Sequence, residues 1–112
     1  MSPVNSVIVF EVTIDVRYDL RDAFERYLNE RHIPDLMATG CFIRASLLRS
    51  PSGRIRARYE APHRAALDRY LNEHAARLRA HVLENFPEGL KFEREEWELL
   101  AIFDLTGRRP QK

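Results

Sequence analysis

The sequence predicts an α+β domain in which two helices cover one face of a four-stranded antiparallel sheet. Four segments alternate apolar and polar residues at the two-residue period of a strand, and two segments repeat apolar residues at helical spacing. Their order along the chain is β-α-β-β-α-β, which is the ferredoxin-like arrangement. The chain has 112 residues, the length of one domain. We expect this domain to span residues 1–103 and a disordered tail to cover residues 104–112.

The first predicted strand covers residues 6–17, and one of its faces is entirely apolar: Ile8, Phe10, Val12, Ile14 and Val16. A helix follows, with Asp19 as its N-cap and Asp22 in the position of a capping-box acid. Its apolar residues recur at helical spacing and form a single stripe: Leu20, Ala23, Phe24, Tyr27 and Leu28. This pattern indicates an amphipathic helix that packs on the sheet.

The end of this helix is predicted from Pro34, which lacks the N–H that would bond back to Glu30. We therefore expect the helix to bend or stop near Arg31 and His32. A short turn from Pro34 to Thr39 should follow. Gly40 should then take the left-handed conformation that leads the chain into the next strand.

Two further strands, over residues 41–48 and 54–61, flank the turn sequence Ser-Pro-Ser-Gly and indicate a hairpin. Cys41 is expected to face the core as a small hydrophobe. The second helix is predicted over residues 62–86, starting with Pro62 as its first helical residue. The last strand is predicted over residues 91–103, with these residues on its core side: Trp97, Leu99, Ala101 and Phe103.

Composition excludes several classes of protein. The net charge of +1 lacks the basic excess of a nucleic-acid-binding protein. No apolar run approaches the roughly 20 residues of a membrane-spanning helix, and no signal peptide is recognisable, so we expect a cytoplasmic protein without a membrane partner. The single cysteine excludes an internal disulfide and a multi-cysteine zinc site, and we expect no cofactor. The 16 arginines reflect either GC-rich coding or bidentate recognition of anions.

The sheet face that the helices leave uncovered predicts a homodimer. In the expected strand order 4-1-3-2, this open face mixes charged and apolar residues: Val7, Val9, Glu11, Thr13, Phe42, Arg44, Ser46, Leu48, Arg56, Arg58, Glu60, Arg94, Glu96, Glu98 and Leu100. A solvated face held by cross-strand ion pairs is one interpretation. Two such faces meeting about a two-fold axis is the interpretation that we favour, because apolar residues lie among the charges.

Four histidines are the main candidates for chemistry. His32 lies near the end of the first helix, where the helix dipole alone would favour it, although it is also a candidate catalytic base. His74 is the stronger candidate, since Tyr27, Tyr59 and Tyr70 are expected to point into the same space and to bind a ligand with it. His63, His74 and His81 are spaced 11 and 7 residues apart on the second helix, so that helix alone cannot chelate a metal. No nucleophile or phosphate-loop motif is present.

Two segments resemble a known family, namely His-Ile-Pro-Asp-Leu-Met-Ala-Thr-Gly-Cys-Phe at residues 32–42 and Tyr-Leu-Asn-Glu-His-Ala-Ala-Arg-Leu-Arg at residues 70–79. With the four strands around them, they are similar to short bacterial proteins of unknown function whose fold resembles the dimeric α/β-barrel superfamily. The resemblance implies a homodimer and a pocket near His32 and His74, between helices and sheet. It implies no catalytic residue.

Two functions are compatible with these observations. The first is a homodimeric module that binds a small molecule or regulates without catalysis. The alternative is a cofactor-independent monooxygenase or isomerase acting on a small ring compound, with a histidine as general base and a tyrosine or arginine polarising the substrate. A haem-degrading enzyme ranks lower, because no histidine is singled out as an iron ligand.

Overall fold

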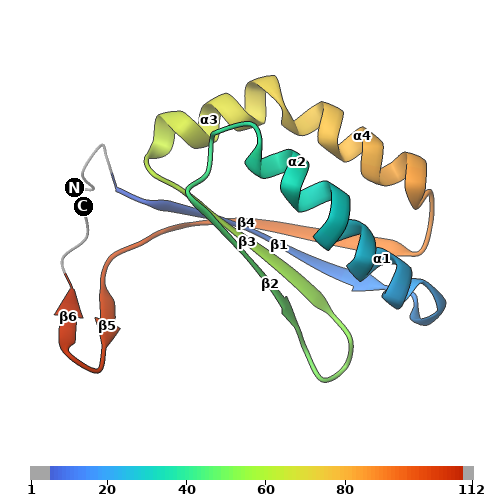
Figure 1. Ribbon diagram of the computed structural model, residues 1–112, viewed down its shortest axis with the longest axis horizontal. Helices are drawn as coiled ribbons and strands as arrows, with labels where there is room; N and C mark the ends of the chain where they lie inside the picture. Colours follow the sequence, from blue (N-terminus) through green and yellow to red (C-terminus); the bar gives the residue numbers. More distant parts are fainter. Residues whose placement is uncertain (1–5, 110–112) are drawn as a thin grey trace.

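The computed structural model describes residues 6–109 and shows one sheet with all of the longer helices on the same side of it (Figure 1). The strands are β1 (Ile8–Val16), β2 (Arg44–Arg49), β3 (Ile55–Ala61) and β4 (Leu90–Glu98). They pair antiparallel in the order β2-β3-β1-β4, so the first and last strands of the sequence lie side by side. The predicted α+β class and four-stranded antiparallel sheet are confirmed.

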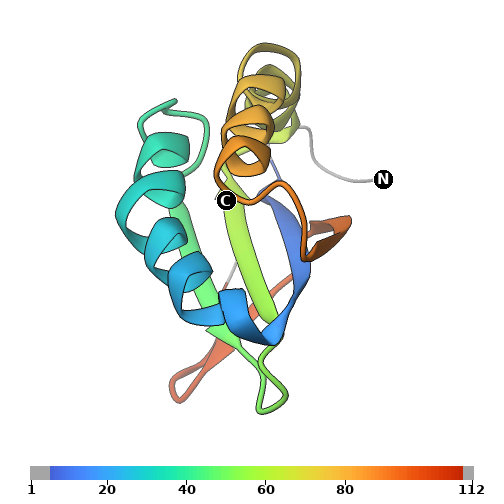
Figure 2. The ribbon, with the colours of Figure 1, turned by 90° about the vertical axis from the view of Figure 1, so that its right-hand side faces the viewer.

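The helical layer consists of two columns that lie next to each other on the sheet (Figure 2). The first column contains η1 (Tyr18–Leu20), α1 (Arg21–Tyr27), η2 (Leu28–His32) and α2 (Ile33–Met37). The second contains α3 (Arg64–Glu73) and α4 (Ala75–Asn85). In the described part of the chain, no helix is both long enough and apolar enough to cross a membrane.

The sequence predicted that the first helix bends or stops near Arg31 and His32, and the structure shows a distortion there without a stop. The first column continues to Met37 through η2, a π-helical turn in which the Ile33 N–H bonds to the Leu28 carbonyl five residues back. A π turn widens the helix by one residue, which relieves the clash that the Pro34 ring would otherwise make with the preceding turn. Gly40 closes the column with φ of +75°, as predicted.

Both predicted helix starts shift by a short distance. Asp19 was expected as an N-cap, but it lies inside η1 and binds Arg17 at 2.6 Å, while Leu20 caps α1 without a side-chain hydrogen bond. The second helix begins at Arg64 rather than Pro62, with His63 as its N-cap: the His63 Nδ1 accepts a hydrogen bond from the Ala66 N–H at 3.2 Å. The expected single helix over 62–86 is also interrupted at one residue, His74, which separates α3 from α4.

The last strand differs from its prediction in both length and orientation. It ends at Glu98, and its register pairs Ile14 with Phe92 and Val12 with Arg94, so these even-numbered residues face the helices. Trp97, expected in the core, therefore lies on the open face. The other residues of this segment are reversed in the same way. Leu99, also expected in the core, lies on the open face, whereas Arg94, Glu96 and Glu98, expected on the open face, lie on the helix side.

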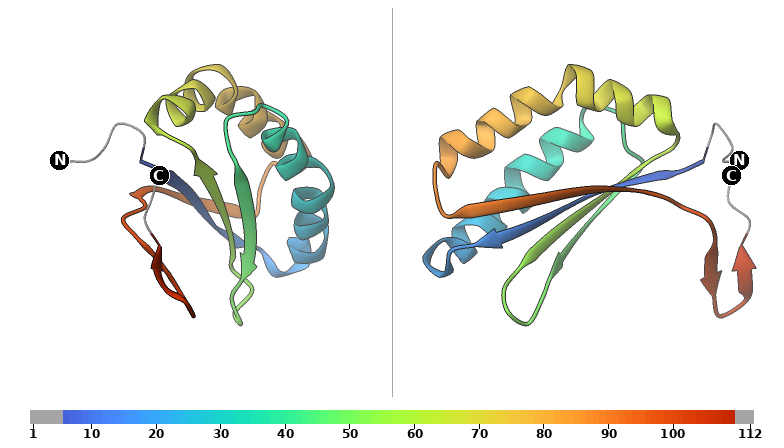
Figure 3. Two further views of the ribbon diagram at one scale, coloured as in Figure 1. Left: turned by 60° about the vertical axis from the view of Figure 1, so that its left-hand side comes forward. Right: turned by 180° about the vertical axis from the view of Figure 1, so that it is seen from behind.

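A short second hairpin follows the sheet, made of β5 (Ile102–Asp104) and β6 (Gly107–Arg109). It extends past the end of the sheet, on the side away from the helices (Figure 3). Asp104 accepts hydrogen bonds from Thr106 and Arg109, which fixes the turn. Residues 104–109 were expected in a disordered tail and are instead part of this hairpin; residues 110–112 of the expected tail lie outside the described residues.

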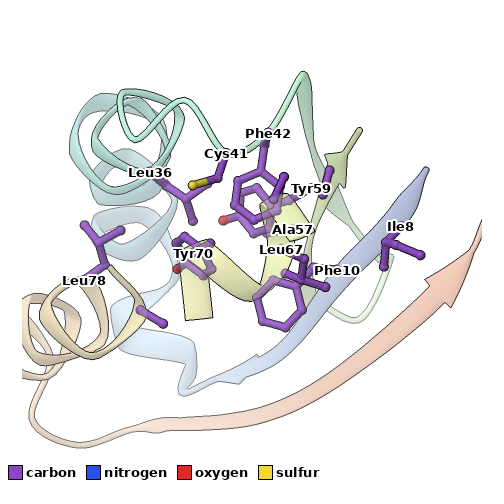
Figure 4. Close-up of a cluster of buried hydrophobic side chains, with 13 residues drawn as sticks. Ile8, Phe10, Leu36, Cys41, Phe42, Ala57, Tyr59, Leu67, Tyr70 and Leu78 are labelled. Atoms are coloured by element: carbon purple, nitrogen blue, oxygen red, sulfur yellow. The ribbon is translucent and has the colours of Figure 1, made fainter. Parts of the chain in front are cut away.

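The core lies between the helices and the sheet. One cluster of buried side chains includes aromatic rings from three elements together with Leu36, Cys41 and Leu78, all of which are labelled in Figure 4. Cys41 is fully buried, as expected. Phe42 precedes β2 instead of lying on the open face, and its ring packs against Tyr59 and Tyr70 with centroids 5.5 and 5.0 Å away.

Candidate ligand-binding site

A cavity of about 40 Å³ lies between the helical layer and the sheet. Five of its lining side chains are polar or charged, and they come from five different elements: His32, Tyr59, Tyr70, Arg79 and Arg94. The other lining residues are all apolar, among them Phe10, Leu28 and Leu36. We call this space the helix–sheet cavity.

The π turn places His32 in the cavity lining, because the extra residue shifts everything after Leu28 around the helix axis. The His32 ring stacks on Tyr27 with centroids 6.1 Å apart. Its Nδ1 is buried and has no hydrogen-bond partner among the described residues. Burial lowers the pKa of His32 to about 4, so the imidazole is neutral near pH 7.

Two phenols line the cavity from the sheet and from α3. Tyr59 is 2% exposed and Tyr70 is 3% exposed, and Figure 4 shows both hydroxyl oxygens pointing to the same side of the cluster. Burial raises the pKa of both phenols, so both carry their protons near neutral pH and can donate hydrogen bonds.

Two guanidinium groups complete the polar lining. Arg79 comes from α4, and Arg94 comes from β4, where its guanidinium lies 5.0 Å from the centroid of the Phe92 ring. Burial lowers the pKa of Arg94, and the nearby charge of Arg79 lowers it further. Sequence reasoning missed both residues: Arg94 was placed on the open face, and Arg79 was not considered.

The five polar side chains share one property. Within residues 6–109, none of them forms a hydrogen bond or an ion pair with another side chain or with the backbone through its side-chain polar atoms. Buried polar groups in proteins are normally hydrogen-bonded. Together they offer a neutral base, two hydroxyl donors and two cationic donors to whatever enters the cavity. The described residues contain no cluster of three or more side chains able to hold a metal ion.

Two other predicted site residues lie elsewhere. Tyr27 does not line the cavity; its hydroxyl is 2.5 Å from the Nδ1 of His81. His74 caps both α3 and α4, and its Nδ1 is 2.9 Å from an Arg77 nitrogen. The structure therefore brings Tyr59, Tyr70 and His32 together around the cavity. Tyr27 stacks on His32 from outside the cavity lining, and His74 lies elsewhere, so their roles in ligand binding stay predictions.

The open face of the sheet forms a second hollow, a groove of about 510 Å³ between the strands and the β5–β6 hairpin. Its apolar lining is Val9, Trp97, Leu99 and Ile102. Its charged lining centres on Glu11, which is 8% exposed and lies 3.0 Å from the Nε of Arg58 and 3.7 Å from that of Arg56. The groove thus combines an exposed apolar set with a cross-strand cluster of opposite charges.

These features define a class: a small α+β domain with a polar cavity under its helices and an uncovered sheet face. The chain matches the family "Domain of unknown function (DUF4286)" over residues 7–100, and it belongs to that family. No curated protein matches the chain.

Solved structures with the same fold come from several bacteria and one uncultured marine organism. A Bacteroides thetaiotaomicron protein of unknown function, described as a possible oxidoreductase, has a TM-score of 0.65 and 15% identity, covering 85% of this chain and 99% of its own. A Nitrosomonas europaea protein, provisionally assigned as an antibiotic biosynthesis monooxygenase, has a TM-score of 0.65 and 16% identity, with 89% and 96% covered. The marine protein, described as dimeric and ferredoxin-like, has a TM-score of 0.60 and 17% identity, with 85% and 96% covered. At these identities the similarity shows the fold alone.

Proposed function

We propose that this chain is a homodimeric, ferredoxin-like β-α-β-β-α-β module that binds a small molecule in the helix–sheet cavity. One observation carries the proposal: five polar side chains from five elements line one cavity without partners among the described residues. The His32 Nδ1 is buried without a partner among the described residues, and an unpaired buried polar group costs roughly 1–3 kcal/mol. A fold that served stability alone would pair this nitrogen or replace the side chain, and a ligand that bonds to it offsets the cost.

The size of the cavity limits what enters it. About 40 Å³ is little more than the volume of one water molecule in the liquid, roughly 30 Å³, and far below the roughly 150 Å³ of an engineered cavity that binds benzene. The ligand therefore inserts a group of a few heavy atoms, or the two helical columns separate to admit a larger one. Arg94 reaches solvent, so the entry lies on the β4 side of the cavity.

The homodimer is supported by the groove on the open face. Trp97 is 50% exposed and lies in the groove with Val9, Leu99 and Ile102, an apolar set that a second subunit would cover. The hairpin beside it carries further exposed apolar residues, Phe103 and Leu105. A related fold described as dimeric adds to this support. A cytoplasmic location, expected from the sequence, stays a prediction.

A second function is favoured by His32, which is neutral, buried and without a hydrogen-bond partner at its Nδ1 among the described residues. Such an imidazole can accept a proton from a substrate while Tyr59 or Tyr70 donates a hydrogen bond to the developing oxyanion. This is the chemistry of a cofactor-independent monooxygenase or isomerase. It predicts turnover of the bound molecule, whereas a binding module predicts stabilisation without turnover.

The test is a fragment titration of the full chain followed by amide chemical shifts. The panel consists of neutral fragments with at most about nine heavy atoms, such as propionamide, benzamide and phenol. Binding in the cavity should move the amide signals near His32, Tyr59 and Tyr70. The Ala57→Leu variant adds three carbons at a lining position and should abolish these shifts, while Ala65→Leu on the exposed side of α3 should not. Shifts confined to the surface, or unchanged by Ala57→Leu, would contradict the proposal.

For any fragment that binds, oxygen consumption and product formation separate the two functions. Turnover in the parent protein that disappears in His32→Phe would establish the enzyme. Binding with no turnover would establish the module.

A further inference from the structure

The two arginines of the helix–sheet cavity differ from most other arginines of the chain. Nine arginines in the described residues form ion pairs with an aspartate or glutamate: Arg17, Arg31, Arg44, Arg49, Arg54, Arg56, Arg58, Arg64 and Arg109. Arg79 and Arg94 line the cavity and form none with the residues described. The chain has 17 acidic residues, so the missing partner does not reflect a shortage of carboxylates.

Both arginines lie on the sides of their elements that face the core, where Arg79 is half-buried and Arg94 is exposed to solvent at one edge. Arg79 lies four residues after Ala75 and three before Val82, both buried, so it belongs to the stripe of α4 that faces the sheet. Arg94 lies on the helix side of β4, opposite Val12 in the register and two residues from Phe92. A guanidinium beside apolar side chains loses part of its hydration, and the charges of Arg79 and Arg94 also repel one another.

The charged groups around Arg79 and Arg94 indicate which kind of group would compensate their positive charge. His32 is neutral, and Tyr59 and Tyr70 keep their protons, so the polar lining of the cavity is positive overall. Glu96 lies on the same face of β4 but is held by Arg64 on α3, with nitrogen and oxygen 2.7 Å apart. No acidic residue lines the cavity, so among the described residues the counter-charge is not supplied by the chain itself.

We propose that Arg79 and Arg94 form a carboxylate-binding subsite of the helix–sheet cavity, so that the ligand is a small organic acid. A guanidinium presents parallel N–H donors that match the two oxygens of a carboxylate, and such charge-assisted bonds are about twice as strong as neutral ones. A carboxylate is also small and planar enough for a cavity of about 40 Å³. The body of the acid then lies toward the phenols and His32, among apolar side chains such as Phe10 and Leu36.

This inference rests on the proposed function and adds the class of ligand. The test compares acids with their amides of the same shape: propionate with propionamide, and benzoate with benzamide. Inorganic phosphate is a third arm. Binding to the full chain is followed by the amide signals near Tyr59 and Tyr70 and by the Nε–Hε signals of the arginines, at constant ionic strength.

We expect each acid to bind at least about tenfold more tightly than its amide and to move the Nε–Hε signals of Arg79 and Arg94. Arg79→Gln and Arg94→Gln should weaken binding of the acid far more than binding of the amide, so that the preference is lost. Arg77→Gln, which removes a charge from the same helix outside the cavity, should keep the preference. Urea unfolding of each variant confirms that it is folded.

The outcomes are distinguishable. Equal affinity for acid and amide, a preference that survives in both cavity variants, or tighter binding of phosphate than of any carboxylate would overturn the subsite while leaving the cavity as a binding site. Binding of neither acids nor amides in the cavity would overturn the proposed function itself.

Discussion

Replacing His32 with phenylalanine should remove a large part of the acid sensitivity of this fold. The pKa of His32 is about 4 in the folded chain because burial disfavours its charged form, whereas an unfolded histidine titrates near 6.5. Between these two values the unfolded chain binds a proton that the folded chain does not. The free energy of unfolding is therefore highest above pH 6.5 and falls as the pH drops toward 4.

The size of this effect follows from the two pKa values. Each unit of difference corresponds to about 1.4 kcal/mol, and the linkage integrated from pH 7 to pH 4.5 amounts to about 2.5 kcal/mol per protomer. Phenylalanine keeps the stacking on Tyr27 and does not titrate. It also removes the buried Nδ1, and the adjacent cavity accommodates the slightly larger ring.

The assay is urea unfolding of the parent protein and of His32→Phe at pH 7, 6, 5 and 4.5, at one fixed protein concentration because a dimer's stability depends on it. All carboxylates titrate in both proteins, so the difference between the two curves isolates His32. Ala65→Leu, on the exposed side of α3, is the control and should follow the parent. Identical pH dependence of the parent and His32→Phe would refute the reasoning, as would a His32 pKa near 6.5 measured by NMR.

Three further predictions concern the open face and the backbone. Light scattering should show the parent as a particle of twice the 13.2 kDa protomer mass and Trp97→Glu as a monomer. The control Leu83→Glu, at an equally exposed position of α4, should keep the mass of the parent. A monomeric parent would contradict the interface. Glu11→Ala should lower the free energy of unfolding by about 1 kcal/mol in urea, because the Glu11 carboxylate is nearly buried and forms ion pairs with two arginines. Asp15→Ala breaks an exposed ion pair on the same strand and should change the free energy of unfolding by less than about 0.5 kcal/mol. Gly40→Ala should cost about 1 kcal/mol in thermal or urea unfolding, since φ is +75° and no atom lies near the added methyl group; an unchanged stability would show that the turn relaxes.

The strands were predictable where one face is uniformly apolar. β1 has this property over its whole length, and the hairpin of β2 and β3 is marked by its turn. The same reasoning fails for β4 because the apolar residues of this segment lie on both faces of the sheet. Leu90 and Phe92 face the helices, whereas Trp97 and the adjoining Leu99 face the open side. Only the hydrogen-bonded register with β1 decides which set is inside, and register is a property of two strands, not of one.

The candidate site was predictable only in part, for a related reason. His32, Tyr59 and Tyr70 were candidates from the sequence and lie around one cavity. Arg94 was missed because the face of β4 was assigned from its apolar residues alone. Arg79 could have been found from the sequence, because it places a charge in the apolar stripe of α4 between Ala75 and Val82.

The helix interruptions were not readable from residue patterns. Pro34 predicts that the helix is distorted just before it. Both a helix end and a π turn would accommodate the missing N–H and the proline ring. The π turn is formed because it keeps Leu36 packed in the core. The break at His74 has no proline or glycine to announce it.

The π turn lets the first helical column tolerate one particular change in chain length. It takes up one residue more than ordinary α-helical winding, and each helical residue advances the chain by about 100°. Deleting Asn29 while the helix returns to ordinary winding would therefore leave the residues downstream on nearly their present faces, with Leu36 still toward the core. The same loss of one codon inside α1, where the helix holds no extra residue, would turn His32 away from the binding pocket.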